Sequence, residues 1–149
     1  MKNILILFLM IFSASFGEIE ASIKEFTSYY DNGQLEAKGK YINGTKVGFW
    51  YIFDEKGILR EEITYINGEA LFGIKTFSEK GLISSGGTIR DGFQDGKWSF
   101  YDDKGILLIT MEFKNGLRDG IFIAYSEKGA PIVVGIFERN ALKEIKSLK

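Results

Sequence analysis

The chain has 149 residues, of which 45% are hydrophobic and 26% charged, and its formal net charge is −1. This composition is typical of one globular domain, and the balanced charge provides no basic surface to attract nucleic acid. Histidine and cysteine are both absent, which excludes disulfides, thiol nucleophiles and the commonest general base and zinc ligands. The 18 glycines, 13 phenylalanines, 7 tyrosines and single proline favour aromatic-rich strands joined by many turns, so we expect an all-β protein.

Segment 1–17 has the pattern of a secretory signal peptide. A positive start at residues 1–3 precedes the apolar run Ile4 to Phe12, and small residues follow in segment 13–17. As a helix the run would be about 14 Å long, whereas a membrane-spanning helix needs roughly 20 apolar residues. We expect cleavage after Gly17, with cleavage after Ser15 as the alternative; a buried first strand is the competing interpretation of the run.

This signal pattern predicts where the mature chain is found. No cysteine stands near the junction for lipid attachment, and no membrane-spanning segment is expected after cleavage. The expected location is therefore the periplasm or the cell exterior. Because the chain has no disulfides, its stability there must come from packing alone.

The rest of the chain is a sequence repeat of constant length. Equivalent residues recur at the interval that separates Gly33 from Gly57. Glycines, Asn-Gly or Asp-Gly pairs, and aromatic or aliphatic residues each recur at this interval. Arg139-Asn140 fills the fifth pair position, and Asn140 is a suitable substitute because Asn also adopts the left-handed conformation. The glycines are Gly33, Gly57, Gly81, Gly105 and Gly129; the pairs begin at Asn43, Asn67, Asp91 and Asn115; the first aromatic position holds Phe26, Trp50, Ile74, Trp98 and Phe122.

Each copy has the pattern of a β-hairpin. In the fourth copy, a strand at Trp98 to Tyr101 leads into an Asp-x-Lys-Gly turn, and a strand at Ile106 to Phe113 leads to an Asn-Gly turn. Because both connections are short, successive strands must be antiparallel neighbours, giving a meander of roughly ten strands. We therefore predict one twisted sheet, an antiparallel β-hairpin repeat array of five copies across residues 26–140, about 45 Å long.

The segments outside the repeats are expected to cap the sheet. Residues 18–25 form the predicted N-terminal cap, and residues 141–149 the predicted C-terminal cap or tail. The spacing of Leu142, Ile145 and Leu148 is that of a short amphipathic helix, and a frayed tail is the alternative.

Binding residues are sought where a copy departs from the common pattern. The second copy carries Phe72 where the other copies have the glycines Gly48, Gly96 and Gly120, which indicates a local bulge or slip within residues 68–77 that is either functional or tolerated drift. In the fourth copy both faces of the strand from Ile106 are apolar, so a terminal segment or a partner should cover it. The candidate binding surface is Trp50, Phe72, Trp98, Ile106 and Leu108.

The aromatic positions have two interpretations. Trp50 and Trp98, with Phe26 and Phe122, form either an exposed ladder that binds sugar rings or a protein, or the core of the sheet. We favour the core, because a single-layer meander has little other buried area.

Polar clusters give no catalytic site. Glu61 and Glu62 are neighbours on a strand and point to opposite faces, so they cannot act on one substrate. Asp102-Asp103 stands in a turn, where acids are common. The segment 84–87, Ser-Ser-Gly-Gly, lacks the lysine and helix start of a phosphate-binding loop. We expect no enzyme activity, no cofactor and no metal.

The repeat resembles the MORN repeat in its shorter bacterial variant. The likeness spans residues 26–140 and is strongest at Gly48-Phe49-Trp50, at Tyr65-Ile66-Asn67-Gly68 and at Gly96-Lys97-Trp98; Ile74 and Pro131 depart from the pattern. The resemblance implies a hairpin array that serves as a protein-interaction or membrane-associated scaffold without agreed catalytic residues. Bacterial members are often labelled antitoxin components.

These observations predict an exported, non-enzymatic repeat scaffold that binds another protein through its extended sheet surface. Two alternatives stay open. One is binding of carbohydrate or a cell-wall component through the aromatic ladder, and the other is an antitoxin, immunity-type or self-associating protein.

Overall fold

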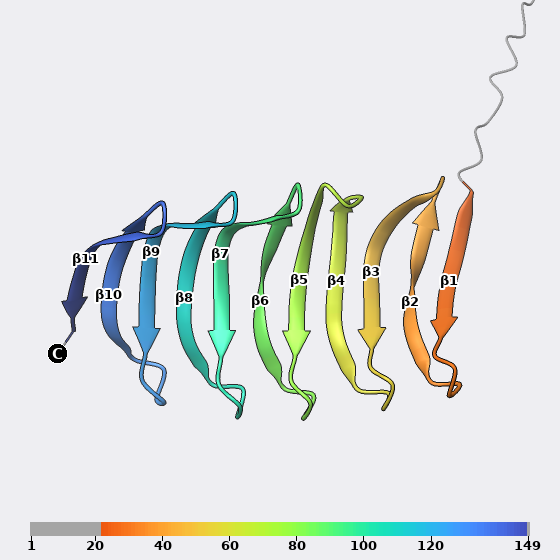
Figure 1. The fold of residues 1–149 in the computed structure, drawn as a ribbon, viewed down its shortest axis with the longest axis horizontal. Coiled ribbons are helices and arrows are strands. Elements are labelled where there is room, and N and C mark those ends of the chain that lie inside the picture. Colours follow the sequence, from red (N-terminus) through yellow and green to blue (C-terminus); the bar gives the residue numbers. More distant parts are fainter. Residues whose placement is uncertain (1–21, 149) are drawn as a thin grey trace, which may run out of the picture.

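The computed structural model describes residues 22–148, so the predicted signal peptide and the first half of the predicted N-terminal cap, residues 18–21, lie outside the described residues. All regular structure in this range is β, and eleven strands form one antiparallel sheet in chain order (Figure 1). The predicted all-β hairpin array is confirmed. The strands are β1 Ile23–Tyr29, β2 Leu35–Ile42, β3 Thr45–Phe53, β4 Leu59–Asn67, β5 Leu71–Phe77, β6 Ile83–Arg90, β7 Phe93–Tyr101, β8 Leu107–Lys114, β9 Leu117–Tyr125, β10 Pro131–Glu138 and β11 Ala141–Ser147.

The Asn-Gly turns form one rim of the sheet. Asn43 and Gly44 between β2 and β3 have φ angles of 50° and 79°, and Arg139 and Asn140 have 46° and 71°. Two consecutive left-handed residues are what a two-residue type I′ hairpin turn requires, and few side chains other than Asn accept this conformation. The substitution of Asn140 for glycine is thereby confirmed.

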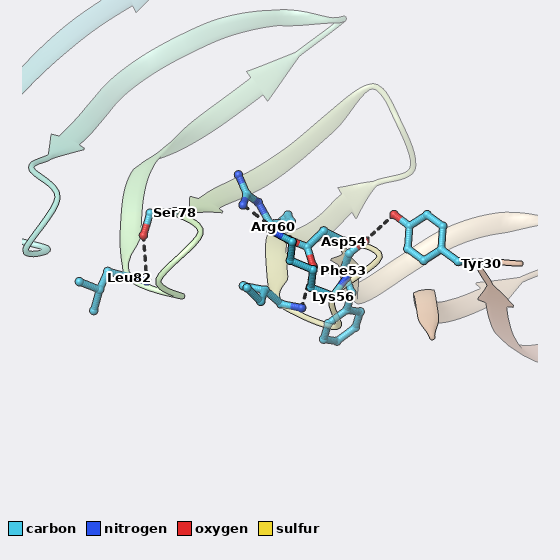
Figure 2. Close-up of polar contacts among 8 residues, drawn as sticks. Tyr30, Phe53, Asp54, Lys56, Arg60, Ser78 and Leu82 are labelled. Atoms are coloured by element: carbon cyan, nitrogen blue, oxygen red, sulfur yellow. Dashed lines mark hydrogen bonds and ion pairs between the residues drawn. The ribbon is translucent and has the colours of Figure 1, made fainter. Parts of the chain in front are cut away.

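The opposite rim is built from turns of a second kind (Figure 2). Asp54 accepts two hydrogen bonds at its Oδ1 atom, from the backbone N–H of Lys56 at 2.9 Å and from that of Ile58 at 3.0 Å, and Gly57 takes a φ of 78°. The next turn uses a serine, since the Ser78 hydroxyl accepts from the Leu82 N–H at 3.3 Å. Asp or Ser at this position therefore closes the turn, as expected for these residues. The first turn differs, since Tyr30 holds the position and Asn32 accepts from the Gln34 N–H at 2.9 Å.

A single row of side chains crosses the middle of the sheet and forms most of its core. Along the row, large residues alternate with small or medium ones on neighbouring strands. Its apolar members include the most buried side chains among residues 22–148. We name this the central row; it consists of Phe26, Gly39, Trp50, Ile63, Ile74, Gly87, Trp98, Met111, Phe122, Gly135 and Ile145.

The two tryptophans lie on glycines of the preceding strand. A Cβ atom added to Gly39 would fall 2.1 Å from the Trp50 ring, and one added to Gly87 would fall 2.3 Å from the Trp98 ring. Each indole N–H donates to a backbone carbonyl, that of Lys40 at 3.2 Å and that of Thr88 at 3.1 Å. The ring is thus held against the sheet by both packing and a hydrogen bond, and its one polar atom is satisfied.

A wide bulge brings each tryptophan over its glycine. Between the pairs Lys38–Tyr51 and Lys40–Val47, one residue of β2 faces three residues of β3, beginning with Gly48 at a φ of 61°. The same shift occurs in β7 beginning with Gly96, and a bulge of the same size in β9 spans residues 119–121, with Gly120 at its centre. The glycines Gly48, Gly96 and Gly120 therefore mark these bulges in the sequence.

The second copy lacks this wide bulge and has Phe72 where the other copies have glycine; its irregularity is of another kind. Here the register shifts in β4 between Tyr65 and Asn67, and three residues instead of two join β4 to β5. Gly73, one place later in the sequence, has no left-handed φ. The irregularity is therefore real and begins at Tyr65, slightly earlier than the predicted range 68–77.

The C-terminal segment is a strand, where a helix or a frayed tail was expected. The Arg139-Asn140 turn reverses the chain, and β11 then pairs with β10 along its length. Glu144 occupies the position that holds glycine in each wide bulge, and β11 has no such bulge. Only one residue, Lys143, is left without a partner in β10. Ile145 therefore stands opposite Gly135, where the repeat pattern would place Lys146. The helical spacing of the apolar residues was overridden by the available hydrogen bonds of β10.

The contact between tryptophan and glycine predicts a large effect of one methyl group. Gly39→Ala forces the Trp50 ring off its site, so we expect the free energy of unfolding to fall by about 1–3 kcal/mol, the usual cost of overpacking. The matched control is Gly73→Ala, because the atom nearest to its added Cβ is 4.0 Å away. Urea unfolding of both variants measures the effect, and equal stabilities of the two would contradict it.

The turns predict a pH dependence. The pKa of the Asp102 carboxyl is lowered, chiefly by the hydrogen bond from the Ile106 N–H, because that bond favours the anion. Its contribution to stability is present above the ordinary pKa and is lost as the pH falls through the lowered one. Serine fills this position in two other turns, so the Asp102→Ser variant should keep the turn. The difference in the free energy of unfolding between the wild type and this variant should narrow as the pH falls from about 6 to about 2.5. Urea unfolding across this range tests it; a pH-independent difference would contradict the assignment.

Candidate binding surfaces on the two sheet faces

The sheet has two faces of different character. The side chains of the central row project from one, which we call the tryptophan face. Their neighbours in each strand, such as Tyr51 next to Trp50, project from the other, which we call the opposite face. On the tryptophan face, aromatic side chains of the first two copies contact one another in sequence, from Phe26 through Tyr41, Trp50 and Tyr65 to Phe72.

The structure does not bring the five predicted binding residues together. Trp50 and Trp98 are only 3% and 5% exposed, so the aromatic ladder belongs to the core, the interpretation favoured from the sequence. Phe72 is half-buried on the tryptophan face, with its ring 5.3 Å from that of Tyr65. A ligand reaching the ladder would find little tryptophan surface.

The other two predicted residues lie elsewhere. Ile106 is half-buried in the Asp102 turn, where its N–H donates to the Asp102 carboxylate at 2.8 Å, and it is not part of β8. Leu108 is exposed in β8 and, two residues before Thr110, projects from the opposite face. Of the five, Leu108 has the most solvent-accessible side chain.

Leu108 belongs to an exposed apolar surface that the sequence analysis missed. Ile121 is paired with Ile136, and Ile123 with Val134, across β9 and β10 on the opposite face. Four members are between 39% and 47% exposed, and the other two are half-buried. We name this surface the outer apolar patch; it consists of Leu108, Ile121, Ile123, Ile132, Val134 and Ile136.

The repeat shows that the fold does not require these apolar side chains. The position of Ile121 holds Lys97 one copy earlier, and the position of Ile123 holds Lys75 two copies earlier. On the same face, Glu62 of the second copy and Lys75 of the third copy form an ion pair at 2.7 Å. Comparing equivalent opposite-face positions across copies would have revealed the patch from the sequence alone.

The irregular loop of the second copy supplies a charged cover for the aromatic residues. Glu69 accepts from Lys46 at 2.8 Å, and the Lys46 ammonium lies 5.1 Å from the Trp50 ring centroid and 5.4 Å from that of Tyr65. The hydrogen bond raises the pKa of Lys46 and lowers the pKa of Glu69. The ion pair and its cation–π contacts explain this loop as a structural feature.

The polar clusters considered for catalysis have structural roles. Glu61 stands opposite Ile52 on the tryptophan face, whereas Glu62 pairs with Lys75 on the other. Ser84 and Ser85 bond to the Thr76 hydroxyl at 2.9 and 2.8 Å. Within residues 22–148, no group of three or more acidic side chains is placed to hold a metal ion, and no helix there could span a bilayer.

Fold and faces together define an antiparallel β-hairpin repeat protein. Residues 24–43, 46–67 and 94–115 match the family model described as MORN repeat variant, so the chain carries repeats of this family. The resemblance inferred from the sequence is confirmed, and the repeat type is that of a scaffold without enzymatic activity of its own. The antitoxin role implied by the resemblance stays a prediction.

Comparisons with other proteins add little. No curated protein matches the chain significantly. Among solved structures, TarM is 14% identical, with a TM-score of 0.34. The match covers 67% of this chain but only 18% of the TarM chain. S. aureus TarM bound to Fondaparinux, alpha-GlcNAc-glycerol and UDP gives 14% identity, a TM-score of 0.34, and coverage of 68% and 18%. A protein of unknown function from Bacteroides fragilis NCTC 9343 gives 10% identity, a TM-score of 0.20, and coverage of 87% and 94%. TM-scores of this size support no conclusion about fold or function.

Proposed function

We propose that the protein is an exported repeat scaffold that binds a protein partner through the outer apolar patch. The observation that carries the proposal is that the positions of the outer apolar patch hold polar residues in earlier copies and apolar residues in the last ones. Lysine, glutamate or serine occupies several of them in earlier copies, whereas exposed or half-buried isoleucine and valine occupy them in β9 and β10. Exposed apolar clusters of this kind mark interaction sites.

The energetics favour a partner with an apolar surface of its own. Four aliphatic side chains that are nearly half exposed would each contribute about 1 kcal/mol on full burial. Charged residues flank the patch and supply a polar rim. They include Glu144 of β11, which is paired with Ile136, and Lys97 of β7, which is paired with Glu112 of β8. An apolar centre with a polar rim is the usual anatomy of a protein interface.

Export is supported by the signal-peptide pattern of segment 1–17. The alternative of glycan binding through the aromatic ladder is not favoured by the burial of both tryptophans. The immunity-type alternative differs only in the identity of the protein bound, and the same experiment addresses it.

The test is capture of the partner from the exported fraction of the native cell. The variant Ile121→Lys/Ile136→Lys carries lysines that the fold already holds at the equivalent positions 97 and 40. It should capture at least about tenfold less of the protein that the wild type captures, because docking would bury unpaired charges.

The matched control is Ile66→Lys, an exposed isoleucine in β4 far from the patch. It should capture the partner as the wild type does. Equal capture by all three chains would contradict the role of the patch, and absence of the chain from the exported fraction would contradict export.

A further inference from the structure

A second surface departs from the repeat pattern, at the other end of the sheet. On the opposite face of the first hairpins, a hollow of about 470 Å³ lies across β1, β2 and β3. This volume falls within the range of about 300–1,000 Å³ found for small-ligand sites. We name it the first-repeat hollow; its lining includes the side chains of Glu25, Thr27, Lys38, Lys40, Phe49 and Tyr51.

Two glycines contribute only backbone atoms to the lining of the hollow. Gly39 and Gly48 line it without side chains, and a Cβ atom added to Gly48 would meet nothing within 4 Å. The wide bulge of β3 thus contributes Gly48 to the lining on this face and Trp50 to the other face.

Two aromatic rings, together with Val47, form the apolar part of the hollow. The Phe49 and Tyr51 centroids lie 6.5 Å apart with their planes at 22°, and Phe49 is 58% exposed. The equivalent positions in later copies hold no aromatic residue: they are Gly73 and Lys75, Lys97 and Ser99, and Ile121 and Ile123. The fold therefore does not need these rings, which indicates a role in binding.

Charged groups surround the rings. The Lys40 ammonium pairs with Glu25 at 2.9 Å, and the Lys38 ammonium lies 5.0 Å from the centroid of Tyr51. The hollow thus offers hydrogen-bond donors and an acceptor beside an apolar platform.

We propose that the first-repeat hollow binds a saccharide ring, stacked on Phe49 and hydrogen-bonded through its hydroxyls to Glu25, Lys38 and Lys40. A purely apolar ligand would desolvate the charged groups without providing partners for them. A phosphate would meet Lys38 but also the Glu25 carboxylate. A sugar ring combines a C–H face with hydroxyls that both donate and accept, so it satisfies both parts of the lining.

The experiment titrates the isotope-labelled protein with cellopentaose, maltopentaose and N-acetylchitopentaose separately, each to about 10 mM, and follows amide resonances by NMR. At least one saccharide should shift the resonances of β1, β2 and β3 in a saturable manner. Phe49→Lys should weaken that binding by about tenfold or more. The fold tolerates lysine at this position, since Lys97 occupies it in the fourth copy.

Controls separate this site from the outer apolar patch. Tyr51→Ser introduces the side chain that the fourth copy carries at Ser99, and it should also weaken saccharide binding. Ile121→Lys should leave saccharide binding unchanged. Phe49→Lys should in turn leave capture of the protein partner unchanged.

Three results would overturn the proposal. One is no binding of any of the three saccharides, and another is binding that Phe49→Lys and Tyr51→Ser leave intact. The third is a decaproline peptide that binds these strands when no saccharide does, which would assign the aromatic pair to an extended peptide.

Discussion

The sheet depends on the contact between a tryptophan ring and a glycine of the neighbouring strand. A single layer of strands has no second layer to bury its side chains, so its core must be made within one face. Trp50 on Gly39 and Trp98 on Gly87 achieve this, because a ring covers backbone where a partner side chain is missing. The wide bulges at Gly48 and Gly96 lie in the strands that carry the tryptophans, just before each of them. They place each ring over the glycine of the neighbouring strand.

Much of this arrangement follows from the sequence. The constant spacing of the repeat fixes five hairpins, and the two glycine series fix their turns, since positive φ leaves few alternatives to glycine and asparagine. The wide bulges at Gly48 and Gly96 were not predicted, because the sequence indicated an irregularity only in the second copy. β11 was not predicted, because its apolar spacing fits a helix and only the open edge of β10 makes it a strand.

The candidate surfaces were harder to predict. Trp50 and Trp98 are conspicuous in the sequence, but both are buried and pack on the sheet beside the bulges of β3 and β7. Side chains that the fold can do without are found by comparing equivalent positions instead. This comparison separates Phe49 and Tyr51 at one end of the opposite face from Ile121 and Ile136 at the other. The scaffold thus presents two chemically distinct surfaces on the same face, away from its core.

The central claim is that the tryptophans belong to the core through both ring packing and the indole hydrogen bond. Hydrogen exchange of the two indole Nε1–H groups, followed by NMR, tests it most directly. The account predicts slow exchange of both, because Trp50 donates to Lys40 and Trp98 to Thr88. Exchange at the rate of an exposed indole would show that the rings face solvent and would contradict the account.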